Sequence, residues 1–182
     1  MQRTISRKKL IEVLLWVAVV IATIGLGLGI GQWSASCRHN DLLDKQLHFT
    51  VQTDSGKNVS PADSTFAGKP MVINFWAIWC PPCKAELPDF QEVYDAYKDK
   101  VNFLFINEVQ WRDDSISSVR SFMQANGYDF PVYYDVTGEA GTSCNVSSIP
   151  LTLFVGKDGK VAYTYNAAMS KAQIVSQIEK LL

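Results

Sequence analysis

Blocks of apolar residues separated by turn residues run along most of this chain and predict alternating strands and helices. Short apolar runs bounded by turn residues predict strands, and apolar residues at helical spacing predict helices. The predicted strands span residues 46–52, 58–60, 71–76, 101–107, 130–134 and 160–165, and the predicted helices span residues 84–98, 115–125 and 170–182. Strands that alternate with helices indicate an α/β sheet with helices on its faces, in which right-handed crossovers make the strands at 71–76 and 101–107 parallel.

The N-terminal segment has a longer apolar run. Val13–Ile30 contains no charged residue over 18 positions, which is about 27 Å as a helix and close to the thickness of a bilayer core. We therefore expect one transmembrane helix at Leu10–Gly31. Four basic residues between positions 3 and 9 precede it. Because such residues stay on the cytoplasmic side, we expect a single-pass protein of the cell membrane whose remaining chain is extracytoplasmic.

This run divides the chain into a cytoplasmic N-terminus with its membrane anchor at 1–32, a polar linker at 33–45 and one domain at 46–182. Two alternatives for the N-terminal segment stay open. A cleaved signal peptide would use the small residues Ser34–Ala35–Ser36. A lipoprotein would be acylated at Cys37, although Ser34 stands where such signals usually carry Leu.

The charge of the chain argues against one class of partner. Residues 13–182 keep 13 of the 17 basic residues and 17 of the 18 acidic residues, which gives a net charge of −4. A nucleic-acid-binding domain would instead carry a basic patch or stripe. We therefore expect no nucleic-acid partner.

A Cys-x-x-Cys, formed by Cys80 and Cys83, lies where the strand at 71–76 runs into the helix at 84–98. The unpaired N–H groups and the dipole of a helix start stabilise a thiolate, which is the form that attacks disulfides. Because Cys80 comes first and nearer to solvent, we expect it to attack a substrate disulfide. Cys83, one turn deeper, is then placed to resolve the mixed disulfide. The chemistry needs no cofactor beyond the redox-active Cys80–Cys83 pair.

Two other uses of a Cys-x-x-Cys fit this sequence poorly. Half a zinc site would need a second pair of ligands, but the other cysteines are single and the only histidines are His39 and His48. We assign His39 to the solvated linker and His48 to a structural role in its strand. Haem attachment would need His directly after the second cysteine, where Lys84 stands.

The segment Asn74–Pro88 reads N-F-W-A-I-W-C-P-P-C-K-A-E-L-P, and it resembles the active-site segment of the membrane-anchored TlpA/ResA-like thiol-disulfide oxidoreductases. Glu86 and Pro88 narrow the resemblance to that group among thioredoxin-fold proteins. The resemblance implies a thioredoxin-like fold, with a central mixed sheet flanked by helices and an N-terminal β-hairpin. It also implies a protein-disulfide reductase that receives electrons from a membrane thiol carrier and acts on envelope or secreted proteins, for example in cytochrome c maturation.

The resemblance also assigns a loop. The segment Ile149–Thr152 resembles the loop that holds a cis proline against the active-site disulfide in thioredoxin folds. A cis bond before Pro150 would let the backbone of Ile149 face an extended substrate segment and pair with it in β fashion.

Three further side chains are candidates for the site. Glu86 lies three residues after Cys83 and can share its helix face. There a partly desolvated carboxyl could take the Cys83 proton. The alternative is that Glu86 is an acid of the first helical turn, favoured only by the helix dipole. Asn74 stands where similar thioredoxins carry a buried Asp, which favours Glu86 as the proton acceptor. Trp79, adjacent to Cys80, is the better candidate for a substrate surface than Trp76.

The weak stabilisation of the Cys80 thiolate indicates in which direction the protein transfers electrons. As N-cap, Cys80 accepts one backbone N–H, from Cys83, because Pro82 has none, and no histidine stands in the motif. A less stabilised thiolate favours a disulfide reductase over a thiol oxidase, which stays the alternative.

Functions of other classes fit less well. A peroxiredoxin-like peroxidase would carry Thr where Ala77 stands, and a copper-delivery module would need a histidine beyond His48. A non-catalytic binding domain would not require the dithiol, Glu86 and Pro150 together.

Two cysteines remain, Cys37 on the linker and Cys144 six residues before Pro150. A disulfide between them, a third-thiol role for Cys144 near Cys80, and intermolecular pairing of Cys37 are alternatives to two unpaired cysteines. We favour two unpaired cysteines, in which case Cys144 packs as a small apolar residue.

Overall fold

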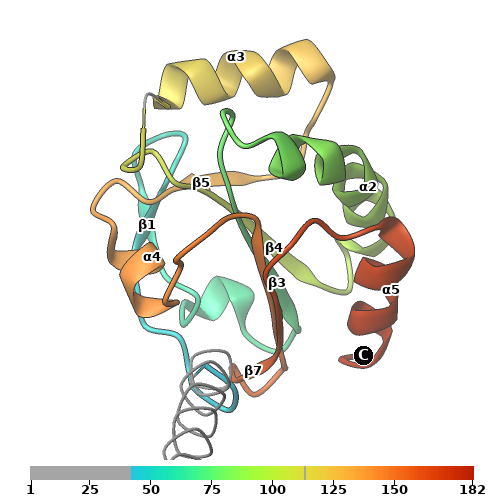
Figure 1. Ribbon diagram of the computed structural model, residues 1–182. Coiled ribbons are helices and arrows are strands. Elements are labelled where there is room, and N and C mark those ends of the chain that lie inside the picture. Colours follow the sequence, from blue (N-terminus) through green and yellow to red (C-terminus); the bar gives the residue numbers. More distant parts are fainter. Residues whose placement is uncertain (1–41, 113) are drawn as a thin grey trace, which may run out of the picture. The chain divides into compact units, whose positions relative to one another are not determined.

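The computed structural model describes residues 42–112 and 114–182 (Figure 1). The expected transmembrane helix at Leu10–Gly31, Cys37 and His39 lie outside these residues. Within the two described ranges, no helix is long and apolar enough to cross a bilayer.

One mixed sheet of seven strands forms the centre of the domain, in the order β2-β1-β5-β4-β3-β6-β7. The strands β3, β4 and β5 are parallel to one another, whereas β1, β2, β6 and β7 join by antiparallel pairing. The strands are β1 Val51–Thr53, β2 Asn58–Val59, β3 Met71–Trp76, β4 Asn102–Asn107, β5 Val132–Tyr134, β6 Leu151–Val155 and β7 Val161–Tyr165. The mixed sheet, the N-terminal hairpin β1–β2 and the parallel pairing of β3 with β4 are confirmed.

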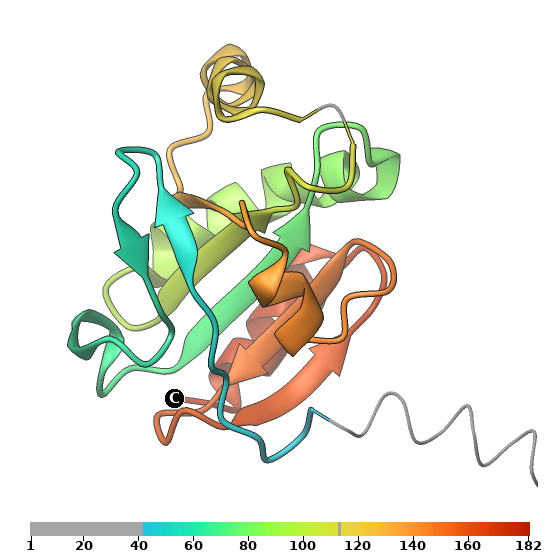
Figure 2. The same cartoon turned by 90° about the vertical axis from the view of Figure 1, so that its left-hand side faces the viewer.

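Helices lie on both faces of the sheet. Figure 1 shows α2 and α5 together on one side and α4 on the other, and Figure 2 looks onto the side that carries α4. The helices are η1 Ser64–Phe66, α2 Pro81–Tyr97, α3 Ile116–Asn126, α4 Glu139–Ser143 and α5 Lys171–Glu179. One apolar core packs between the sheet and α2, α3 and α5, and a second packs on the opposite face.

Strand β3 lies between these two cores, and every one of its residues is buried. Val72 and Trp76 enter the core beneath α2, whereas Ile73 and Phe75 enter the other, because successive side chains of a strand point to opposite faces. A strand covered on both faces explains the continuous apolar run in the sequence.

Helix α3 follows the local signals closely. Ser115 caps its start by accepting the Ser118 N–H, and Gly127 ends it with a φ of 69°, a left-handed conformation that glycine adopts without a steric penalty. The predicted helix at 115–125 is therefore confirmed to within a residue.

The predicted strand at 46–52 is largely wrong. Only Val51–Thr53 pairs in the sheet, and Gln46 makes a single bridge with Lys160. Leu47 and Phe49 alternate with exposed residues because they pack into the core on the α4 side. The alternating pattern therefore reflects the burial of every second side chain. It does not indicate β pairing, because the backbone of this stretch lies outside the sheet.

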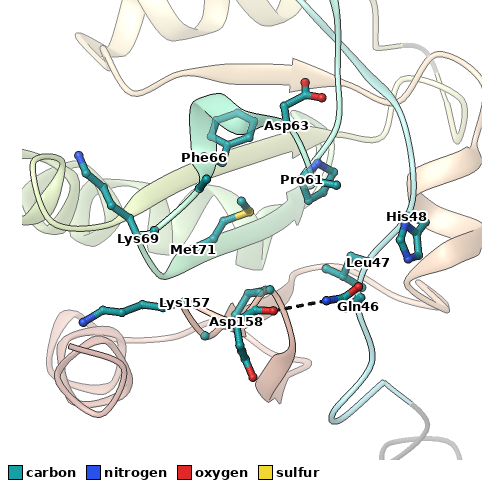
Figure 3. A pocket seen from close by; sticks show the side chains of 16 residues that line it. Gln46, Leu47, His48, Pro61, Asp63, Phe66, Lys69, Met71, Lys157 and Asp158 are labelled. Carbon is teal, nitrogen blue, oxygen red and sulfur yellow. Dashed lines mark hydrogen bonds between the residues drawn. The ribbon is translucent and has the colours of Figure 1, made fainter.

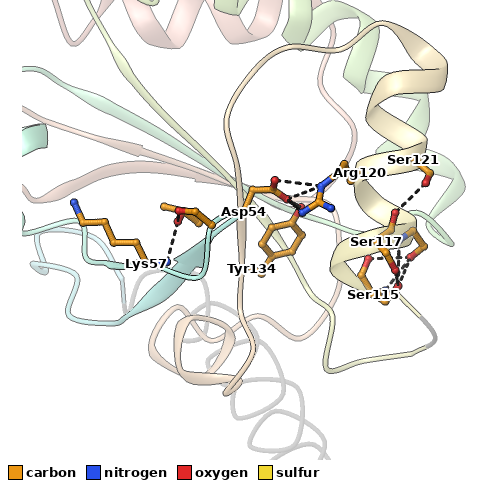
Figure 4. Close-up of polar contacts among 10 residues, drawn as sticks. Asp54, Lys57, Ser115, Ser117, Arg120, Ser121 and Tyr134 are labelled. Carbon is orange, nitrogen blue, oxygen red and sulfur yellow. Dashed lines mark hydrogen bonds and ion pairs between the residues drawn. The ribbon is translucent and has the colours of Figure 1, made fainter.

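The β1–β2 hairpin is joined to α3 by polar contacts around Asp54 (Figure 4). Arg120 forms an ion pair with Asp54 at 2.9 Å, and the Tyr134 hydroxyl donates to Asp54 Oδ1 at 3.3 Å. Both charged side chains are about half exposed, so solvent screens the ion pair and it adds little to stability.

A pair of buried carboxyls lies beneath α4. Glu108 and Asp135 directly follow β4 and β5, whose last residues are in register, and both are fully buried. The Gly141 N–H donates to Asp135 Oδ2 at 2.8 Å. Both Glu108 oxygens and Asp135 Oδ1 have no hydrogen-bond partner among the described residues. Burial, and then the neighbouring Asp135, raise the pKa of Glu108 to about 8.

This burial makes the stability of the domain depend on pH. Because the folded pKa of Glu108 lies above its ordinary value of 4.5, the stability from this group is complete below that value and is lost as the pH rises to about 8. At 1.36 kcal/mol per pKa unit, the free energy of unfolding should fall by up to about 5 kcal/mol over this pH range because of Glu108. Glu108→Gln should not show this fall. Urea unfolding at about pH 5, 7 and 9 measures the difference.

The matched control is Glu139→Gln, which removes an exposed acid from α4 itself. Its stability should follow that of the parent chain at each pH. If Glu108→Gln and Glu139→Gln show the same pH dependence, Glu108 is not the buried neutral acid described here.

Candidate active site

The dithiol lies at the point where β3 passes into α2. Cys80 has extended backbone, with φ −92° and ψ 104°, and is the N-cap of α2, while Pro81 and Pro82 occupy the first helical positions. The Cys83 N–H donates to Cys80 Sγ at 3.2 Å. The predicted capping of the helix by the first cysteine is therefore confirmed, and the sulfur lies at the positive end of the helix dipole.

The structure holds the pair in the oxidised form. Cys80 and Cys83 form a disulfide with an S–S distance of 2.01 Å and a Cα–Cα distance of 5.3 Å. Cys80 keeps 2% of its surface exposed and Cys83 keeps none. Cys80 is thus the more accessible cysteine, although by a small margin.

The loop before β6 lies against the disulfide. The Ile149–Pro150 peptide bond is cis, as the resemblance implied. The Ile149 carbonyl oxygen lies 3.7 Å from Cys80 Sγ, where a reduced Cys80 thiol could donate to it. Asn166, at the end of β7, holds this loop because its Nδ2 donates to the carbonyls of Ser148 and Pro150 at 2.9 and 3.0 Å. No sequence signal identified Asn166, since its role depends on a partner 16 residues away.

Glu86 is buried in the second turn of α2, three residues after Cys83, with 2% of its surface exposed. The Asn74 side chain donates to Oε1 at 2.9 Å, and the Met169 N–H donates to Oε2 at 2.8 Å. Desolvation raises the pKa of Glu86 to about 7 against the lowering effect of these two hydrogen bonds. The alternative of a first-turn acid is therefore wrong, because Glu86 lies too far into the helix.

The two candidate tryptophans have different environments. Trp76 is fully buried and packs against Phe122 at a ring distance of 5.9 Å, so it is a core residue. Trp79 is half-buried beside Cys80, and its ring stacks on Trp111 at 6.5 Å. Arg112 lies over the same ring, with its guanidinium carbon 4.6 Å from the ring centre. The sequence interpretation missed Trp111 and Arg112.

Cys144 lies away from the dithiol. It follows α4 and is fully buried in the core on the opposite face of the sheet from Cys80. Burial, and then the charges of Glu108 and Asp135, raise the pKa of its thiol. The packing of Cys144 as a small apolar residue is confirmed and the third-thiol role is wrong. A disulfide to Cys37 involves a residue outside the described ranges.

A cavity of about 260 Å³ lies at the other end of β3 from the dithiol (Figure 3). Met71 at the start of β3 and Val155 at the end of β6 line it, together with the exposed His48. His48 therefore does not join the catalytic candidates. In the part of the chain that the structure describes, no three His, Cys, Asp or Glu side chains are grouped to hold a metal ion.

Comparisons with known proteins agree with this arrangement. The sequence pattern of the AhpC/TSA family matches residues 43–164. Sporulation thiol-disulfide oxidoreductase A of Bacillus subtilis is 31% identical over 133 residues, which cover 72% of this chain and 78% of that protein. Thiol-disulfide oxidoreductase ResA of Bacillus thuringiensis subsp. konkukian is 31% identical over 135 residues, which cover 74% of this chain and 75% of the relative.

Solved structures show the same fold. The crystal structure of StoA from Bacillus subtilis superimposes with a TM-score of 0.62 at 31% identity, and covers 71% of this chain and 94% of that one. A secreted Mycobacterium tuberculosis disulfide oxidoreductase superimposes with a TM-score of 0.62 at 32% identity, over 73% of this chain and 96% of that one. The thioredoxin-like fold expected from the sequence is confirmed.

The hydrogen bond from Asn74 gives a testable effect on Glu86. A donor to a carboxylate favours its charged form, so Asn74→Ala should raise the pKa of Glu86 above about 7. Carbon-13 NMR titration of the side-chain carboxyl in the oxidised protein measures this. Asn102→Ala is the control, because the Asn102 amide donates to the Phe66 carbonyl instead. A Glu86 pKa that stays unchanged or falls in Asn74→Ala contradicts this account.

Proposed function

This chain belongs to the AhpC/TSA family as a ResA-like thiol-disulfide oxidoreductase, and we propose that it reduces disulfides in extracytoplasmic proteins through Cys80 and Cys83. One observation carries the proposal: the only cysteine of the pair with any exposure caps a helix beside the carbonyl of Ile149, before the cis proline. An extended substrate segment that pairs with the Ile149 backbone would bring its disulfide to Cys80.

The reaction uses the two thiols in sequence. The Cys80 thiolate attacks one sulfur of the substrate disulfide and forms a mixed disulfide, while the other substrate sulfur leaves as a thiolate and takes a proton. Cys83 then loses its proton and attacks Cys80 Sγ, which releases the second substrate thiol. The two electrons of the dithiol have passed to the substrate, and the Cys80–Cys83 disulfide remains.

Glu86 is the proposed acceptor of the Cys83 proton. It lies three residues after Cys83 on the same buried side of α2, and its pKa of about 7 is close to neutral pH. A base with a pKa near the working pH is the most effective proton acceptor. An ordinary exposed carboxylate would be a much weaker base.

The proposed direction is reduction. The Cys80 sulfur accepts one backbone N–H bond and lies at a helix start, which is modest stabilisation for a thiolate. Strong oxidants have a strongly stabilised reduced form. Oxidation of substrate thiols is the alternative direction.

The proposed location and partners follow the relatives and the sequence. A secreted Mycobacterium tuberculosis oxidoreductase has this fold, and the N-terminal apolar segment would anchor the domain outside the membrane. Envelope or secreted proteins, including those of cytochrome c maturation, are the proposed substrates. A membrane thiol carrier is the proposed electron donor.

The second candidate function, from a different class of enzyme, is that of a peroxidase. Ala77, which stands where a peroxidase would carry Thr, has no hydroxyl and is fully buried. Peroxide consumption by the reduced protein at a rate above that of disulfide reduction would favour this second function.

The proposed function is tested by activity and by potential. We expect the reduced protein to reduce insulin disulfides, and Cys80→Ser to abolish the reaction because the attacking thiolate is gone.

Equilibration with glutathione or a stronger dithiol should give a reducing potential, well below the roughly −120 mV of strong oxidants. A potential as high as that value would overturn the reductase direction.

The role of Glu86 is tested by separating the two chemical steps. We expect Glu86→Gln to slow resolution of the mixed disulfide by about 10²-fold or more and to change the initial attack much less, because the proton it accepts belongs to Cys83. Single-turnover kinetics with rapid acid quenching measure both steps. Glu92→Gln, an exposed acid on the same helix, is the control. Unchanged resolution in Glu86→Gln leaves that residue with a structural role only.

A further inference from the structure

The loop after β4 places an exposed aromatic and a cation on Trp79, the residue before Cys80. Trp111, with 37% of its surface exposed, is one of two exposed large hydrophobic residues in the described ranges. Its ring stacks on Trp79, which directly precedes Cys80, with an interplanar angle of 25°. The exposed Arg112 covers Trp79 as well, at 4.6 Å. The three side chains form one continuous surface around Trp79, the residue that directly precedes the attacking cysteine.

This loop is tied to the active-site turn by backbone and side-chain hydrogen bonds. Asp114 Oδ2 accepts the Ile78 N–H at 2.8 Å and the Asn107 amide at 3.1 Å. The Glu108 N–H donates to the Trp76 carbonyl at 3.0 Å. These bonds hold the backbone on either side of Trp111 and Arg112, which lowers the ordering entropy that binding a substrate there would cost.

Arg112 is the charged side chain of this surface, and Asp113 and Asp114 follow it directly in the sequence. Acidic residues outnumber basic ones by four over residues 13–182. The ion pairs found in residues 42–112 and 114–182 use other cations, Lys98, Arg120 and Lys171. Arg112 thus has no carboxylate partner among the described residues. The exposed charge in the first turn of α2, Lys84, is also a cation.

We propose that Trp111 and Arg112 select the substrate by binding an extended, oxidised protein segment that carries an acidic side chain next to its cysteine. This proposal rests on the proposed reductase function and specifies which substrate sequences the reductase recognises. The guanidinium, held on the Trp79 ring by a cation–π contact, keeps its N–H groups free to pair with a carboxylate. Trp111 supplies an apolar wall that limits water around this pair.

The chemistry is that of the proposed reductase, and selection acts on its first step. The Cys80 thiolate forms a bond to the substrate cysteine sulfur, the substrate disulfide breaks, and the leaving thiolate takes a proton from solvent. An attractive carboxylate–guanidinium pair speeds the encounter and holds the disulfide in place before this bond forms.

Disulfide peptides test the proposal on the reduced full-length protein. Three peptides differ only in the residue after the cysteine, which is Asp, Asn or Lys, and each is linked to the uncharged 2-mercaptoethanol. Stopped-flow mixing gives the rate of the first step for each peptide. Bis(2-hydroxyethyl) disulfide, which is small and neutral, reports the reactivity of Cys80 without the surface.

We expect the Asp peptide to react about two- to fivefold faster than the Lys peptide at low salt, as for an exposed ion pair, with the difference shrinking at about 0.5 M salt. Arg112→Gln should abolish this preference and Arg112→Glu should reverse it. Trp111→Ala should slow all three peptides and leave bis(2-hydroxyethyl) disulfide unchanged.

The matched control is Arg120→Gln, which removes the same charge from α3, where Arg120 pairs with Asp54. It should keep the full preference for Asp. Equal rates for all peptides in the parent protein, or a preference that survives Arg112→Gln, would overturn the proposal while the reductase stands. Failure of the parent protein to reduce even bis(2-hydroxyethyl) disulfide would overturn the reductase function and this proposal together.

Discussion

The hydrogen bond from the Cys83 N–H to the Cys80 sulfur is the contact on which the site depends. It exists because β3, buried on both faces, delivers Cys80 to the start of α2 in the extended conformation of an N-cap. With proline in the first two helical positions, the Cys83 N–H is the first of the helix that can reach the sulfur. The same arrangement leaves 2% of the Cys80 surface accessible and none of that of Cys83, and it brings the Ile149 carbonyl to Cys80.

Two buried glutamates on opposite faces of the sheet show how hydrogen-bond donors set acidity. Glu86 accepts from Asn74 and from the Met169 N–H, and its pKa is raised to about 7. Glu108 has no donor among the described residues and lies beside Asp135, and its pKa is raised to about 8. Both are desolvated; the two donors lower the pKa of Glu86, whereas the neighbouring Asp135 raises that of Glu108 further. The first lies three residues after Cys83 in α2, and the second beneath α4.

The sequence predicted those parts of the domain that depend on local signals. The buried run of β3, the Ser115 cap and Gly127 stop of α3, and the Cys-x-x-Cys at a strand-to-helix turn are all of this kind. The cis bond before Pro150 needed the family resemblance, because the intrinsic preference for cis is small.

The parts that sequence reasoning missed depend on residues brought together only by folding. The stretch at 46–50 alternates because it packs on a core, and its backbone lies outside the ladder. Asn166, Met169 and Asp114 act on the site through hydrogen bonds across 16 to 83 residues of chain. Trp111 stacks on Trp79 across a loop that has no periodic pattern.

The most direct test of the proposed chemistry is the covalent intermediate. In the full-length Cys83→Ala protein, the resolving thiol is absent, so a substrate attacked by Cys80 remains attached as a mixed disulfide. Isolation from cells and peptide mass spectrometry should find extracytoplasmic proteins joined through Cys80. Recovery of the same adducts on Cys144, or equal recovery from a Cys80→Ala, Cys83→Ala protein, would contradict the assignment of Cys80 as the attacking thiol.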